Sequence, residues 1–108
     1  MKKVKVEDYT YEIIKDYKNA FNEEEFKNKM TSYFYDYDYV VGDIAYDKLR
    51  LKGFYSDDSK KANKINKISM LDDYIKDNCA YDCKHFVAKK VILWYNLYEN
   101  SKRWMYER

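Results

Sequence analysis

The segment YDYVVGDIAYDKLRLKGFY, residues 37–55, is the stretch from which the fold of this chain is predicted. In its second half, Leu49 and Leu51 alternate with Arg50 and Lys52. Successive side chains of a strand point to opposite faces, so the leucines share one face and the basic residues share the other. This alternation is typical of an antiparallel strand with one buried face and one face in water. We therefore predict a β-hairpin at the centre of a small sheet.

Both glycines of the chain, Gly42 and Gly53, lie in this hairpin. Gly42 and Asp43 interrupt the strand pattern, and we expect them to form a turn or a bulge between strands at 37–41 and 46–55. Gly53 is expected to mark a bulge or a close approach of the backbone to a neighbouring group. Gly42, Asp43 and Gly53 are therefore the predicted structural turn residues.

Two strands and a helix are predicted before the hairpin. Valine alternates with lysine at 3–6, and β-branched and aromatic residues at 9–14 indicate a second strand. Asn22 is a good helix N-cap, and Glu25 follows it at the spacing of a capping box. Apolar residues then recur every three or four positions as far as Tyr37, so we expect the helix to extend through this region.

The elements after the hairpin are a loop, a helix and a last strand. Residues 56–66 are polar and rich in lysine, which is typical of an exposed loop. Ser69 is expected to cap a second helix that ends near Cys79. A strand is predicted at 86–91, and residues 92–108 return to an amphipathic, helical pattern.

These elements predict an α+β fold with a single small domain. We expect about five mostly antiparallel strands, two main helices on one face of the sheet and a C-terminal helical tail. The 108 residues are enough for one core. We assign residues 1–91 to the α+β domain and residues 92–108 to a C-terminal helical extension.

The composition excludes some classes of protein and leaves others open. The formal net charge is +2, and hydrophobic residues make up 46% of the chain, which argues against intrinsic disorder. The basic N-terminal residues are followed by no apolar signal region, and no apolar run is long enough to span a membrane. We therefore expect a cytoplasmic protein, in which Cys79 and Cys83 are reduced. The small net charge neither favours nor excludes a nucleic-acid partner.

The chain resembles a known family over most of residues 9–91. The match is carried by Asn-Glu-Glu at 22–24, YDYVVGD at 37–43 and LRLKGF at 49–54, and further along by Cys79 and Cys83. These residues are similar to those of the YutD-like family of small proteins from low-GC Gram-positive bacteria. The chain departs from that pattern at 44–45, where the family has an aromatic residue followed by glycine. The resemblance implies a small α+β domain and carries no established biochemical activity.

The most reactive-looking group in the sequence is Cys79, Cys83 and His85. A zinc site needs four ligands, so a fourth would have to come from elsewhere, such as Asp82. A reversible disulfide and a pair of small buried hydrophobic side chains are the other two interpretations. A Cys83–His85 dyad lacks an orienting third group in the sequence. The sequence also contains no phosphate-binding loop. Taken together, these observations lead us to predict no metal, no cofactor, no small-molecule substrate and no catalytic residue.

Surface side chains remain as the basis for a functional prediction. Our first hypothesis is a non-catalytic binding module that holds nucleic acid on a basic track. The alternative is a protein–protein adaptor or inhibitor that uses the Tyr/Trp-rich surface and tail, because these residue types are favoured at interfaces. The candidate nucleic-acid-binding residues are Arg50, Lys52, Lys60, Lys61, Lys64, Lys67, Lys89 and Lys90. The candidate protein-interface residues are Tyr98 and Trp104.

Overall fold

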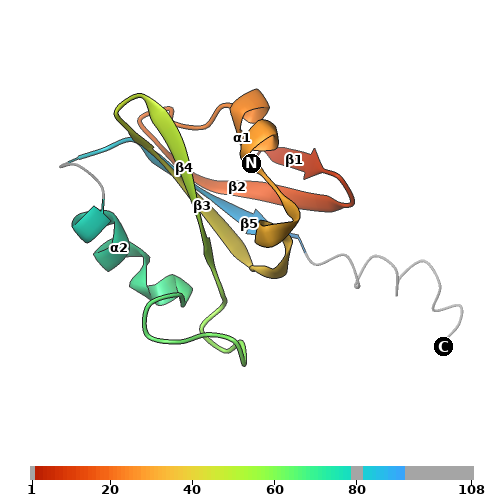
Figure 1. Cartoon of the computed structure of the whole chain (residues 1–108), viewed down its shortest axis with the longest axis vertical. Helices are drawn as coiled ribbons and strands as arrows, with labels where there is room; N and C mark the ends of the chain where they lie inside the picture. Colours follow the sequence, from red (N-terminus) through yellow and green to blue (C-terminus); the bar gives the residue numbers. More distant parts are fainter. Residues whose placement is uncertain (1, 79–81, 92–108) are drawn as a thin grey trace, which may run out of the picture.

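The computed structural model describes residues 2–78 and 82–91, which form an antiparallel sheet with two helices (Figure 1). The sheet has five strands in the order β1-β2-β5-β3-β4. The predicted α+β class and strand number are confirmed. The strands are β1 (Lys3–Val6), β2 (Tyr9–Tyr17), β3 (Tyr39–Ala45), β4 (Lys48–Phe54) and β5 (His85–Lys90), and the helices are α1 (Glu23–Lys29) and α2 (Leu71–Asn78), with 3₁₀ segments η1 (Ser32–Asp36) and η2 (Ile68–Met70).

The last strand of the described residues, β5, is the middle strand of the sheet. β5 pairs with β2 on one side and with β3 on the other, antiparallel in both cases. β1–β2 and β3–β4 are hairpins, and β5 joins them into one sheet. The sheet is therefore complete only when the chain has been made as far as Lys90.

The turn of the central hairpin lies at Tyr46 and Asp47, not at Gly42 and Asp43. Tyr46 and Asp47 have φ values of 53° and 62°, the left-handed pair of a tight two-residue hairpin turn. Gly42 and Asp43 instead lie inside β3, in unbroken register with β4. The predicted position of the turn is thus wrong. Glycine is the residue expected in a left-handed turn, but here Tyr46 and Asp47 adopt that conformation.

The glycines are needed for close packing against aromatic rings. A Cβ atom at Gly42 would lie 2.3 Å from ring carbons of Phe86, and one at Gly53 would lie 2.3 Å from the ring of Tyr37. The expected close approach at Gly53 is confirmed. The alternative of a bulge there is not, because Gly53 pairs with Val40 in continuous register.

The two helices cover opposite faces of the sheet, each over its own apolar cluster. Val40 belongs to the cluster under α1, whereas its neighbour Val41 belongs to the cluster under α2. Phe86 and Val87 divide in the same way. The prediction that both helices lie on one face is therefore wrong. The central strands are apolar on both sides, and a strand with two buried faces needs a covering layer on each.

The helix boundaries differ from the prediction in two places. The Asn22 side chain accepts a hydrogen bond from the Glu25 backbone N–H at 3.0 Å, which confirms the cap. However, α1 ends at Lys29 because Met30 is extended, and the following apolar residues form η1. Ser69 does not cap a helix: it lies inside η2, and its N–H donates to Asp57 at 3.0 Å.

Among the described residues, neither helix is long and apolar enough to cross a membrane.

Candidate functional site

A groove lies between the strand β4, the helix α2 and the loop that joins them. It encloses about 440 Å³. β4 contributes one lining side chain, the loop contributes two and the η2–α2 segment contributes the rest. The lining residues are Lys52, Lys64, Ile65, Met70, Asp73, Tyr74, Asp77 and Asn78.

Two contacts, one at the C-terminal end of α2 and one at its middle, set the direction of the helix along the strand. Arg50 donates from Nη2 to the carbonyl oxygen of Asn78 at 2.7 Å, at the C-terminal end of α2. One turn earlier, the ring of Tyr74 packs edge-to-face on Phe54 with centroids 5.5 Å apart. The helix therefore runs antiparallel to β4 and lies beside it in Figure 1. Residues of both elements line the groove.

Arg50 is held by a buried carboxylate on the neighbouring strand. Its Nε and Nη2 donate to the two oxygens of Asp43 at 2.8 and 3.0 Å. Asp43 is 1% exposed, whereas the side chain of Arg50 is 46% exposed. The hydrogen bonds to Asp43 raise the pKa of the guanidinium above its ordinary value. These bonds, together with the one to Asn78, fix the guanidinium between the sheet and α2.

Lys52 lies on the same face as Arg50 and points into the groove. Its Nζ is 5.4 Å from the ring centroid of Phe54 and 6.0 Å from that of Tyr74. Lys64 lines the groove from the loop. The groove thus brings together two of the predicted basic residues, but α2 covers the sheet face that we expected to be open.

The other predicted basic residues are dispersed. Lys61 donates to Asp36 at 2.7 and 2.9 Å, and Lys90 donates to the carbonyl oxygen of Tyr35 at 2.8 Å. Lys60 and Lys89 are exposed and make no ion pair within residues 2–78 and 82–91.

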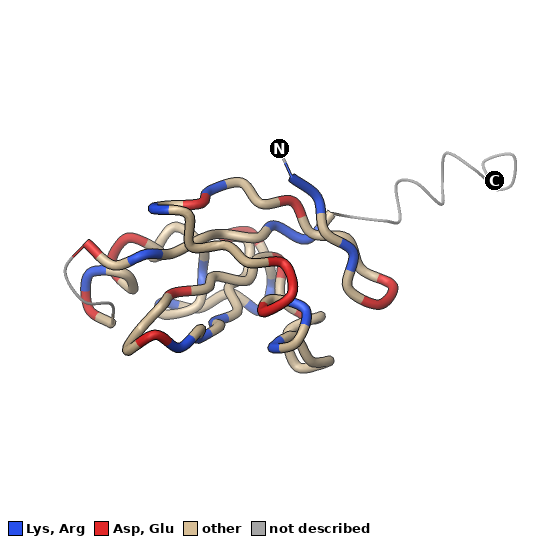
Figure 2. Tube along the Cα trace, turned by 90° about the horizontal axis from the view of Figure 1, so that it is seen from above, with Lys and Arg blue, Asp and Glu red and all other residues tan. Residues whose placement is uncertain are grey.

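The remaining lysine, Lys67, is half-buried in a parallel bridge with Tyr55. In Figure 2, basic and acidic stretches are interspersed along the trace and separated by other residues.

A group of hydrogen bonds links the lysine-rich loop at 56–66 to η1. The carboxylate of Asp36 accepts from Lys61 and also from the Tyr55 hydroxyl, at 2.7 Å. Lys61 first, and then Tyr55, lower the pKa of Asp36. The same carboxylate raises the pKa of Tyr55 to about 12. The loop is therefore tied to the domain at this point.

Of the interpretations considered for the cysteine–histidine group, the disulfide is the one that agrees with the state of Cys83. Cys83 is disulfide-bonded, so the expectation of a reduced thiol, which was drawn from the compartment alone, is wrong for this residue. Cys79 lies outside the described residues. His85 is 6% exposed, and its Nδ1 lies 3.1 Å from the carbonyl oxygen of Cys83. Its Nε2 is buried without a hydrogen-bond partner in the described part of the chain.

Asp82, considered above as a fourth zinc ligand, is engaged elsewhere. Its carboxylate accepts hydrogen bonds from Lys18 and Tyr17, and Lys18 is the main cause of its lowered pKa. In the part of the chain that the structure describes, no three metal-ligating side chains gather.

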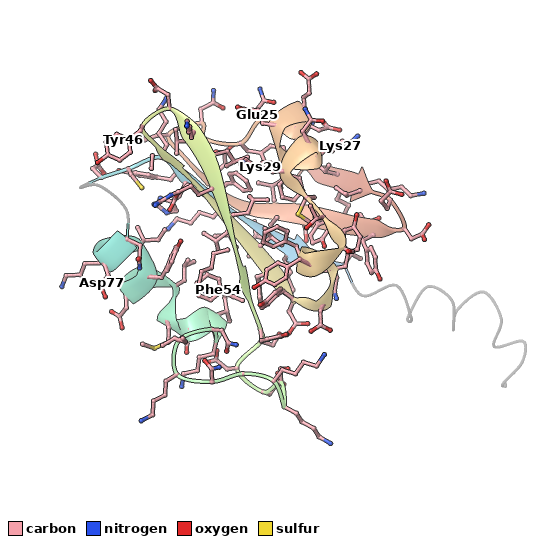
Figure 3. All side chains as sticks on the ribbon, viewed as in Figure 1. Glu25, Lys27, Lys29, Tyr46, Phe54 and Asp77 are labelled. Atoms are coloured by element: carbon pink, nitrogen blue, oxygen red, sulfur yellow. The ribbon has the colours of Figure 1, made fainter. Side chains whose placement is uncertain are left out.

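A second hollow, of about 310 Å³, lies between α1 and the β3–β4 turn. Glu25 and Lys29 line it from α1, and Asp47 lines it from the turn. Figure 3 shows Tyr46 at this turn, where the side chain is 99% exposed. This hollow is separate from the β4–α2 groove, since the two share no lining residue.

The predicted interface residues Tyr98 and Trp104 lie outside the described residues and stay a prediction. Sequence reasoning missed the acidic wall of the groove, which Asp73 and Asp77 form. Their spacing of four residues places them on one side of a helix. Nothing local in the sequence indicates that β4 lies opposite them.

Comparisons with known proteins agree with this fold. A family model described as "Putative antitoxin YutD-like" matches residues 5–89. The "Putative antitoxin YutD" of Bacillus subtilis (strain 168) is 42% identical over 86 residues, which are 80% of this chain and 94% of that protein. The solution NMR structure of protein yutD from B. subtilis superimposes with a TM-score of 0.71 at 40% identity, covering 84% of this chain and 83% of that chain. The chain therefore belongs to the YutD-like family.

Proposed function

We propose that this protein is a non-catalytic module that binds and inhibits a partner protein, in an antitoxin-like role. The observation that carries this proposal is the groove between β4 and α2. Its lining combines the exposed Ile65, at 75% of its surface, with Met70, Tyr74 and charges of both signs. Aromatic residues and methionine are enriched at protein interfaces. The printed name of the B. subtilis relative supports the same role.

The cationic side chains give less support to nucleic-acid binding. Arg50, Lys61 and Lys90 are used in contacts within the fold. A side chain held in this way must give up its intramolecular partner before it can pair with a phosphate. Lys60, Lys64 and Lys89 are exposed, and they carry the second candidate function, a salt-dependent contact with nucleic acid.

We place the protein in the cytoplasm within this proposal. There the disulfide at Cys83 is exposed to a reducing environment. The proposed binding surface does not use Cys83, so the role does not depend on the state of that residue.

The test is a pull-down of the tagged protein from its own cell extract, with nuclease added to one half. A discrete protein that is recovered equally in both halves is the expected result. A partner that is lost with nuclease, or nucleic acid as the only material recovered, would transfer the function to the lysine residues named above.

Inhibition is tested separately with the recovered protein. Expressing that partner alone is expected to slow growth, and co-expression with this chain is expected to restore it. If the partner is harmless when expressed alone, protein binding stands but the inhibitory role is rejected.

A further inference from the structure

We propose that the β4–α2 groove takes an extended peptide segment of the partner, which adds as a strand to the outer edge of β4 and packs on α2. The inference rests on the proposed protein-binding function and names the binding mode. Among the strands that the structure describes, β4 lies at one edge of the sheet. Strand addition to such an edge is a general mode of peptide recognition, in which main-chain hydrogen bonds supply affinity.

The register shows which backbone groups of β4 point outward. The Ile44 N–H donates to the carbonyl oxygen of Lys84 at 3.1 Å, so the even-numbered residues of β3 face β5. On β4, their cross-strand partners are Leu49, Leu51 and Gly53. In an antiparallel ladder, when one residue of an opposed pair directs its backbone groups away from the other strand, its partner does the same. Consequently Leu49, Leu51 and Gly53 direct their N–H and C=O groups away from β3.

The same edge already accepts a strand-like partner farther along. Tyr55, the next residue of this alternating set, donates to Asn66 at 2.7 Å and accepts from Ile68 at 2.8 Å. Within the described residues, Leu49 and Leu51 have no such backbone partner. Leu49 and Gly53 are buried, so Leu51 is the most accessible residue of this outward set, and its neighbour Lys52 lines the groove.

The walls of the groove indicate the chemistry of the peptide. Asp73 and Asp77 line the α2 side and make no ion pair in the described part of the chain. Met70 and Tyr74 line the same groove and offer apolar surface. Alternate residues of an added strand are about 7 Å apart on one face. The arrangement fits an extended segment with an apolar residue and a basic residue two positions apart.

The chain offers matched variants for testing the edge. Leu51→Pro removes the outward N–H of β4, and proline is tolerated where the N–H does not enter the ladder. Lys5→Pro is the control, because Lys5 is an exposed outward-facing residue of β1, the opposite edge. Both variants are first checked for a native amide NMR spectrum.

A second pair of variants tests the acidic wall without touching the sheet. Asp73→Lys combined with Asp77→Lys reverses the wall at two exposed positions. Asp72→Lys is its control, since Asp72 is exposed on the same helix but does not line the groove. This pair keeps the proposal testable if Leu51→Pro fails to fold.

The probe is a phage-displayed library of random dodecapeptides, selected on the full-length protein. The enriched peptide, made synthetically, is titrated into the labelled protein. We expect the largest amide shift changes at Leu51, Lys52 and along α2. The affinity is expected to fall at least tenfold in the Asp73/Asp77 variant and in Leu51→Pro, and to change less than twofold in Asp72→Lys and Lys5→Pro. Peptides that bind the α1 hollow, ignore both variants, or are not enriched at all overturn the proposal.

The two proposals fail in different ways. If wild type and the Asp73/Asp77 variant capture a partner protein equally, the proposed binding function stands, but the groove is rejected as the binding site. If peptides bind the groove but the cell extract yields no protein partner, the groove stands as a peptide site and the proposed function is rejected.

Discussion

Several residues of this protein owe their role to contacts with other strands or with distant segments of the chain. Gly42 lies under the ring of Phe86, and Asp43 lies beside Arg50 on the next strand. Each contact joins two residues that are far apart in sequence or on different strands. Three predictions follow from such contacts.

Gly42→Ala is expected to destabilise the protein by about 1–3 kcal/mol, because a new methyl group must displace a buried ring. Phe86 is fully buried. Gly53→Ala is expected to be milder, since the facing Tyr37 is only half-buried. Urea unfolding measures both values, and equal losses would contradict this explanation.

Arg50→Met is expected to destabilise the fold by about 2–3 kcal/mol, because it leaves the buried carboxylate of Asp43 without its partner. Lys52→Met should change stability by less than about 1 kcal/mol, since it removes only a partly exposed cation–π contact. The comparison is made by urea unfolding at neutral pH. If Arg50→Met is as mild as Lys52→Met, Arg50 is free for the binding role that its sequence position suggested.

Asp36 gives the protein a pH-dependent contribution to stability. Its pKa is lower in the folded protein than the value of about 3.9 in an unfolded chain. The stabilisation is therefore present above about pH 4 and lost as the pH falls through the folded pKa. Because the pair with Lys61 is exposed, we expect less than about 1 kcal/mol.

The measurement is urea unfolding from about pH 6 to about pH 3. Asp36→Asn should show a smaller loss of stability over this range than wild type. Asp58→Asn is the matched control, at an exposed carboxylate with no ion pair among the residues described. A wild-type pH profile in Asp36→Asn would show that the Lys61 contact does not stabilise the protein.

At the scale of elements, α1 is the one whose start is specified locally. Asn22 caps it, and Phe26 carries its packing into the core at 0% exposure. A helix of this length is marginal by itself, so the cap and the buried ring must act together.

Asn22→Ala is expected to lower the free energy of unfolding by about 1 kcal/mol, the usual value for loss of an N-cap. Asn28→Ala is the control, since Asn28 is exposed inside the same helix. Thermal or urea unfolding gives both numbers. A larger loss in Asn28→Ala than in Asn22→Ala would contradict the capping argument.

At the scale of the whole molecule, β5 holds the two hairpins together. It contributes Phe86 to the cluster under α1 and Val87 to the cluster under α2. Since β5 is the last strand of the described residues and pairs with β2 and β3, sheet formation depends on contacts between distant parts of the chain. Both described clusters are built from residues before Val91.

We therefore expect a chain truncated after Val91 to unfold cooperatively, with a stability within about 0.5 kcal/mol of the full chain. A chain truncated after Lys84, which lacks β5, is expected not to fold. Circular dichroism during urea titration distinguishes these outcomes. Loss of cooperative unfolding in the longer truncation would reject the assignment of residues 1–91 as the domain.

Features that depend on neighbouring residues were determined by the sequence itself. The alternation of β4 and the cap at Asn22 were both predicted correctly. So were the existence of both hairpins and the final strand. In each case the signal lies within a few residues, where side-chain alternation and local hydrogen bonds act directly.

Tertiary structure decided the rest. Gly42 resembles a turn residue until Phe86 is known to lie over it, and Arg50 resembles a free surface cation until Asp43 and Asn78 surround it. The side of the sheet that α2 covers, and hence the groove beside β4, follows from packing two apolar faces at once. Such arrangements are stabilised by contacts between segments that are distant in sequence, so no local stretch of sequence can predict them.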